Sequence, residues 1–210
     1  MNLQKRESSV DLIFKNTDYW EGFEFTFCGE KHKFVSSLLV GDSLGHIIDE
    51  LYYMCIEIID ESHNGFPLKT AHNNPDDTNQ ITDLYVYLRF DPEGEDTYLS
   101  LHRDIYKNND FSIDVDIEYF NEERFRYKVS YFDLCYAAAK AATKVIKGRG
   151  FTGFHYDTES DRIDIHHFLN VKHLGIFKKP LSPYHDKDYH TKHTETASLE
   201  DEIELLMFDM

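Results

Sequence analysis

The stretch FSIDVDIEYFNEERFRYKVSYFDLCYAAAKAATKVIKGRG, residues 111–150, decides the fold. Its first part alternates apolar and polar side chains from Phe111 to Tyr119, and the polar positions include Asp114, Asp116 and Glu118. A period of two residues is typical of a strand with one buried face. The pattern therefore predicts a strand that points apolar groups inward and these three carboxylates outward.

The second part of the stretch predicts a helix. Ser130 and Asp133 have the spacing of a capping box, and Gly148 is suited to end the helix. Small and apolar residues recur between them at helical spacing, namely Leu134, Ala138, Ala141 and Val145. We expect this small-residue helix to lie close to the sheet. The segment before it is interpreted as a charged turn. Its Arg124, Arg126 and Lys128 could face the acidic sheet or solvent, and ion pairs with Glu122 and Glu123 are the default interpretation.

The chain before this stretch predicts a hairpin and a helix. Residues 23–28 alternate phenylalanine with polar residues and pair with residues 33–35 across a turn at 29–31. The first twenty residues are interpreted as peripheral, with Leu12, Ile13, Phe14 and Trp20 as the residues that could dock on the body. A helix begins near Asp42 or Ser43 and ends at Asn64-Gly65. Residues 64–80 lack an apolar period and are predicted to form a long loop.

Further strands complete the predicted sheet. Residues 84–90 and 97–102, joined by the acidic turn 91–96, form an antiparallel meander with residues 111–119. Residues 150–156 and 161–174 are interpreted as another strand pair.

The polar segment 178–197, with histidines at 185–193, is interpreted as a linker. Residues 198–208 are interpreted as a short acidic helix with Leu199, Ile203 and Leu206 on one face. The result is an α+β fold: an antiparallel sheet of hairpin plus meander, two main helices on one face, and a short C-terminal acidic helix. We expect one domain at 1–177 and an appended segment at 178–210.

The composition favours a protein partner. The chain of 210 residues is 41% hydrophobic and carries a net charge of −17. Residues 34–123 contain 20 acidic and 4 basic residues. Such a surface disfavours nucleic acid and anionic membranes, and favours a basic protein. No long apolar run or signal-peptide pattern occurs, so we expect a cytoplasmic location, with Cys28, Cys55 and Cys135 as buried free thiols.

No motif predicts a metal or a cofactor. Gly148 to Gly153 match G-x-G-x-x-G, but they follow a predicted helix instead of opening one. His166 and His167 would point to opposite faces of the predicted strand, so they would not share a metal. The row of Asp114, Asp116 and Glu118 is open to three interpretations: a solvated strand face, a partner-binding face, or ligands for a divalent metal.

The acidic elements together give a family resemblance. IDVDIE at 113–118, DPEGED at 91–96 and the acidic helix at 42–61 make the chain resemble immunity proteins of bacterial polymorphic toxin systems. The resemblance implies a cytoplasmic protein without catalytic activity that neutralises a basic, nuclease-like toxin by masking its active or substrate-binding surface. The partner-binding residues predicted on this basis are Asp91, Glu93, Glu95, Asp96, Asp114, Asp116 and Glu118.

Two other functions remain open at this point. One is a small enzyme whose site is assembled from scattered residues, with Asp114, Asp116, His102 and His166 as candidates. The other is a regulatory interaction module that binds through the C-terminal acidic helix.

Overall fold

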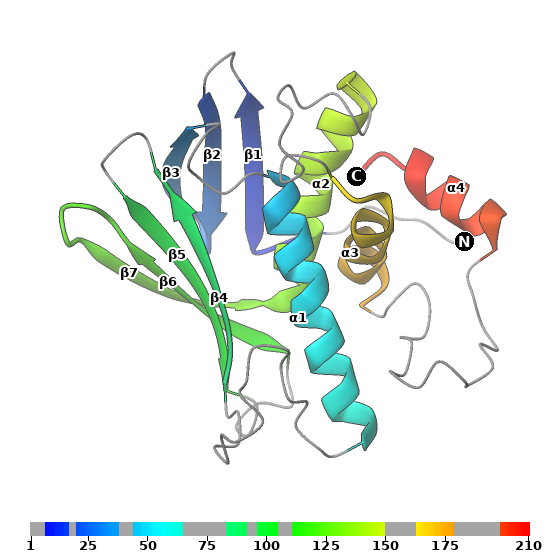
Figure 1. Ribbon diagram of the computed structural model, residues 1–210, viewed down its shortest axis with the longest axis horizontal. Helices are drawn as coiled ribbons and strands as arrows, with labels where there is room; N and C mark the ends of the chain where they lie inside the picture. The colour runs from blue at the N-terminus through cyan, green and yellow to red at the C-terminus, as the bar shows by residue number, and fades with distance from the viewer. Residues whose placement is uncertain are drawn as a thin grey trace, which may run out of the picture.

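The computed structural model describes residues 7–16, 20–37, 44–64, 83–91, 96–104, 111–149, 163–178 and 198–210. The described chain forms two antiparallel sheets and a layer of helices, which lie on opposite sides in Figure 1. This arrangement confirms the predicted α+β class. The antiparallel strands are divided between a three-stranded and a four-stranded sheet, where the sequence predicted a single one.

The three-stranded sheet has the order β1-β2-β3, with strands Val10–Asn16, Trp20–Phe27 and Glu30–Ser37. The predicted hairpin is confirmed, and it turns at Cys28 and Gly29, which both have positive φ as a tight two-residue hairpin requires. The expectation of a peripheral segment is wrong for β1, and the alternative that Leu12 docks on the body is confirmed. Val10 and Leu12 are buried and alternate with more exposed residues, which gives β1 one core-facing side. Cys28 is exposed because it lies in the turn, so the expected burial of this thiol is also wrong.

The four-stranded sheet has the order β4-β5-β6-β7, with strands Asp83–Phe90, Thr97–Asp104, Ser112–Glu118 and Arg124–Ser130. The predicted meander of the first three strands is confirmed. The segment interpreted as a charged turn is strand β7, and the turn lies before it, where Glu122 has a φ of 67°. Its apolar residues explain the difference, because Val129 is buried and Phe125 and Tyr127 pack partly against the core.

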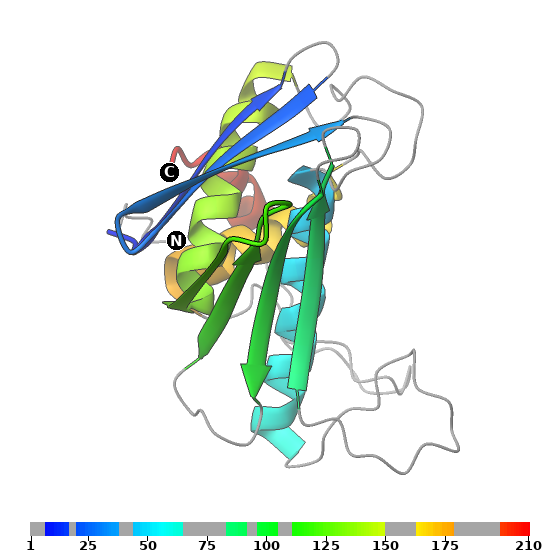
Figure 2. The ribbon, with the colours of Figure 1, turned by 90° about the vertical axis from the view of Figure 1, so that its left-hand side faces the viewer.

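The two sheets meet through their aromatic faces. Figure 2 shows the strands of the three-stranded sheet running at an angle across one end of the four-stranded sheet. The ring of Phe34 lies 4.7 Å from that of Phe90, and the ring of Phe27 lies 5.4 Å from that of Tyr127, measured between centroids. Aromatic pairs at such separations add to the free energy gained by burial.

The helices cover the inner side of both sheets (Figure 1). Helix α1 spans Leu44–Asn64 and helix α2 spans Tyr131–Arg149, close to the predicted ranges. The Tyr131 hydroxyl donates a hydrogen bond to the Leu51 carbonyl and joins the two helices inside the core. Asp133, in the first turn of α2, also contacts the N-terminal segment. Its carboxylate accepts hydrogen bonds from the backbone N–H and the hydroxyl of Ser9, at 2.9 and 2.6 Å. These bonds attach β1 to α2.

The prediction of a strand at residues 161–174 is wrong, since helix α3 occupies Ile165–Phe177. Asp164 caps it by accepting a hydrogen bond from the His167 N–H at 3.0 Å. All of the residues from Phe168 to Gly175 are buried. A helix that is buried on every side shows no amphipathic stripe, which is why its alternating apolar residues resembled a strand. The close crossing of α3 over α2 requires Gly175, because a Cβ there would lie 2.7 Å from the Tyr136 Cα.

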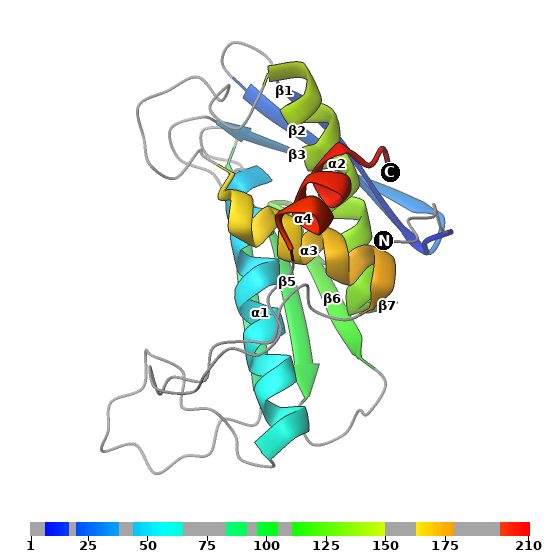
Figure 3. The same ribbon diagram turned by 90° about the vertical axis from the view of Figure 1, so that its right-hand side faces the viewer.

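The C-terminal helix α4, Leu199–Met207, packs against α3 (Figure 3). Ser198 caps it by accepting a hydrogen bond from the Asp201 N–H. The residue of α4 that fills the core is Leu205, which is fully buried, whereas Ile203 of the predicted apolar stripe is exposed. Leu205 and Met210 belong to the same core as the two sheets.

Candidate functional site

The outer face of the four-stranded sheet holds the predicted partner-binding residues of β6. We call it the open sheet face, because the helices cover the other side of this sheet (Figures 1 and 2). Register places its outward residues in rows, which are His102–Asp114–Lys128, Tyr87–Ser100–Asp116–Arg126 and Arg89–Tyr98–Glu118–Arg124. Every carboxylate of β6 thus faces a cation of β7.

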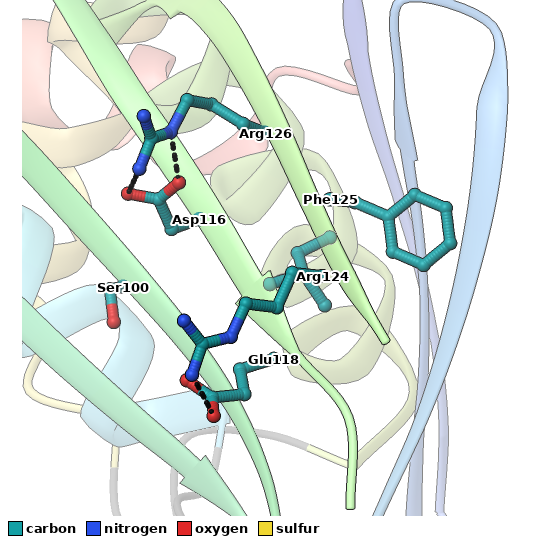
Figure 4. A pocket seen from close by; sticks show the side chains of 7 residues that line it. Ser100, Asp116, Glu118, Arg124, Phe125 and Arg126 are labelled. Carbon is teal, nitrogen blue, oxygen red and sulfur yellow. Dashed lines mark hydrogen bonds and ion pairs between the residues drawn. The ribbon is translucent and has the colours of Figure 1, made fainter. Parts of the chain in front are cut away.

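Two of these pairs are ion pairs around a shallow depression of about 370 Å³ (Figure 4). Arg126 binds both carboxylate oxygens of Asp116, with Nε–Oδ1 and Nη2–Oδ2 distances of 2.5 and 3.3 Å. Arg124 Nη2 donates to Glu118 Oε1 at 2.7 Å. The partners are therefore β6 carboxylates, and not the expected Glu122 and Glu123. Exposed pairs of this kind contribute little to stability, but they cancel charge.

The first and last residues of the predicted acidic turn, Asp91 and Asp96, also bind an arginine. Arg89 donates from Nη2 to Asp91 Oδ2 at 2.8 Å and from Nε to Asp96 Oδ1 at 3.0 Å. Hydrogen bonds from Tyr98 and Arg89 lower the pKa of the Asp96 carboxyl. The side chain of Asp91 is only 6% exposed. Glu93 and Glu95 lie outside the described residues.

Among the described helices, acidic residues outnumber basic ones only in α1 and α4. Helix α1 contains five acidic residues and α4 contains four, and neither contains Lys or Arg. By contrast, β6 and β7 contain three acidic and three basic residues. The negative charge of β6, which suggested an acidic surface, is therefore nearly neutralised by the basic residues of β7. Helices α1 and α4 contain no Lys or Arg that could do the same within the helix.

One aromatic cluster lies where the N-terminal end of α3 meets α1 (Figure 3). The rings of Tyr52 and His167 stack with centroids 4.0 Å apart, and the Tyr52 hydroxyl lies 3.1 Å from His166 Nε2. Tyr53 meets the His167 ring edge-on at 5.3 Å. Asp49 Oδ1 lies 2.7 Å from His167 Nδ1. We call Asp49, Tyr52, Tyr53, His166 and His167 the α1–α3 patch.

The sequence did not indicate this patch. Its α1 residues share one helix face with His46 and Glu50, a spacing that was visible in the sequence. The strand interpretation of residues 161–174 separated His166 from His167 and hid their approach to α1. These contacts join residues more than a hundred positions apart, which periodicity alone does not place together.

The residues considered for a scattered enzyme site are divided between two sides of the molecule. His102 faces Asp114 in the register of the open sheet face, whereas His166 belongs to the helical layer. In the part of the chain that the structure describes, no group of three or more His, Cys, Asp or Glu side chains is placed to hold a metal ion.

A buried histidine joins the two sheets. His32 Nε2 lies 2.6 Å from the Tyr127 hydroxyl, and Nδ1 lies 3.0 Å from the Tyr119 hydroxyl. Tyr127 donates its own proton to Glu30 Oε2, so His32 donates from Nε2 and accepts from Tyr119 at Nδ1. Burial lowers the pKa of His32, and the nearby Glu30 charge opposes this shift. These hydrogen bonds link the three-stranded sheet to the four-stranded sheet.

A buried lysine attaches α4 to α3. Lys172 Nζ donates to the Phe208 carbonyl at 2.7 Å and to the Leu206 carbonyl at 3.4 Å. The residue is fully buried, and burial lowers the pKa of Lys172 to about 8. Lys147 adds to this shift and Asp209 opposes it. The C-terminal helix is therefore held in place at its last turn.

Comparisons with protein-family models, with curated proteins and with solved structures returned no match. Among the helices of the described residues, none is both long and apolar enough to cross a membrane.

Proposed function

We propose that this chain is an acidic binding protein that recognises a basic protein through its helical side, formed by α1, α3 and α4. The observation that carries this proposal is the placement of charge. The β6 carboxylates face the cations of β7, whereas the nine acidic residues of α1 and α4 have no Lys or Arg within their helices. Uncompensated charge on one side attracts and orients a partner of opposite sign.

In this proposal the partner is a toxin, as the resemblance to immunity proteins implies. The net charge of −17 suits a toxin with a cationic surface, such as the surface that a nuclease uses to bind phosphates. The acidic side would occupy that surface and exclude its substrate. The predicted contacts at Asp114, Asp116 and Glu118 would then be secondary, because neighbouring cations already screen them.

A second candidate function is favoured by the Asp49–His167 contact. A carboxylate bound to Nδ1 of a histidine orients the ring, as in sites of general base catalysis. An enzyme of this kind would work at the α1–α3 patch, and the residues His102, Asp114 and Asp116 would have no part in it.

The experiment begins with affinity purification of the partner from native cells, followed by binding kinetics with the purified components. We expect a basic partner whose association rate constant falls steeply as salt rises. Protection against the partner's activity should require one equivalent of this chain. Protection at a small fraction of an equivalent would favour the enzyme, and a rate independent of salt would contradict the proposed binding mode.

A further inference from the structure

The α1–α3 patch combines exposed rings with carboxylates at the surface. The Tyr53 residue is 52% exposed, and Ile165 beside His166 in the chain is 47% exposed. The Asp49 and Glu50 side chains are each 33% exposed. We infer that the α1–α3 patch is a docking site for an arginine-bearing segment of a basic protein. This inference rests on the proposed function and assigns its contact site.

The geometry of the rings favours a planar cation. Tyr52 is held between His167, which stacks on it, and His166, which it meets at 73° with centroids 5.4 Å apart. Tyr53 is fixed against His167 at 68° and keeps about half of its surface open. A guanidinium group stacks on such a ring and is attracted by its π electrons. Because the rings are already ordered by one another, binding loses little side-chain entropy.

The carboxylates supply the complementary charge. Asp49 contacts His167, and Glu50 Oε1 lies 3.1 Å from His46 Nε2. A histidine cancels a carboxylate charge only when it is protonated, so these contacts leave the negative charge in place when the imidazoles are neutral. Helix α1 has no Lys or Arg that could cancel it within the same element. An arginine can pair with a carboxylate through two N–H groups while its plane lies on a ring, whereas lysine offers only a point charge.

The test uses the full chain with two probes, an oligo-arginine peptide and an oligo-lysine peptide of equal length, at low and at physiological salt. Affinity is measured by calorimetry, and amide chemical shifts locate the bound peptide. Tyr53→Ser and Asp49→Asn each change the patch at an exposed or half-exposed position, so the fold should persist. Glu118→Gln is the matched control, because it removes a charge of the same sign from the open sheet face.

We expect tighter binding of oligo-arginine than of oligo-lysine, with the largest shifts at Asp49, Tyr53 and His167. Tyr53→Ser and Asp49→Asn should each weaken binding of oligo-arginine by about two- to fivefold. Glu118→Gln should weaken it less than either. Equal affinity for both peptides, or wild-type affinity in both patch variants, would overturn the inference and leave the proposed function standing. No binding of either peptide at low salt would contradict both.

Discussion

Lys172 allows a direct test of how α4 is attached. Its ammonium group is fully buried and donates to two carbonyls at the end of α4, at Leu206 and Phe208. Substitution Lys172→Met keeps an unbranched side chain of similar length and removes the charge. Comparing the wild type with this variant across pH isolates the proton equilibrium of Lys172, since the other titrating groups are common to both proteins.

The expected effect follows from the two pKa values. The ordinary pKa of lysine is 10.5, and burial lowers that of Lys172 to about 8 in the folded chain. Between these values the unfolded chain binds more protons than the folded chain, so the free energy of unfolding rises with pH. The separation corresponds to about 3 kcal/mol, most of which falls between pH 7 and pH 10.

The assay is urea unfolding of both proteins at several pH values from 7 to 10. The free energy of unfolding of the wild type minus that of Lys172→Met should increase by roughly 2 to 3 kcal/mol over this range. Helical circular dichroism checks that α4 stays folded in the variant. A difference that does not change with pH would refute the reasoning, because it would mean that Lys172 keeps an ordinary pKa.

Three further predictions concern stability. Gly175→Ala should lower the free energy of unfolding, measured by urea unfolding, by about 2 kcal/mol, because the new Cβ would lie 2.7 Å from the Tyr136 backbone. Gly148→Ala is the control and should not lower it, because a Cβ at this position would have none of these neighbouring atoms within 4 Å. Stability should fall as pH drops below about 6.5, because burial lowers the pKa of His32 in the folded chain, and His32→Gln should reduce this acid dependence in the same assay. Deletion of residues 198–210 should lower the melting temperature, since it uncovers the core that Leu205 fills; an unchanged melting temperature would show that α4 is not part of the fold.

Sequence periodicity predicted the elements that have one apolar face. Helix α1 and strands β4, β5 and β6 were predicted because their inward residues recur at regular spacing. The Ala-rich helix α2 was predicted from its cap and its small residues. Periodicity was misleading at α3, where Asn170, Lys172 and His173 are buried among apolar residues and remove the helical stripe.

The pairing between strands could not be predicted in the same way. Asp114, Asp116 and Glu118 do point outward, as their alternation predicted. Their interpretation as an acidic surface depended on the neighbouring strand, and the basic residues of β7 had been assigned to a turn. The α1–α3 patch depends on a helix crossing that involves distant parts of the chain, so no local pattern contains it.

The measurement that tests the central claim most directly compares two variants with the same change in net charge. The helical variant replaces the acidic residues Asp49→Asn, Glu50→Gln and Glu204→Gln, and the sheet variant makes the substitutions Asp114→Asn, Asp116→Asn and Glu118→Gln. The association rate constant with the purified basic partner is measured for both at low ionic strength. We predict that the helical variant associates roughly tenfold more slowly than the wild type, and that the sheet variant changes much less. Slow association of the sheet variant, with the helical variant unaffected, would contradict the account.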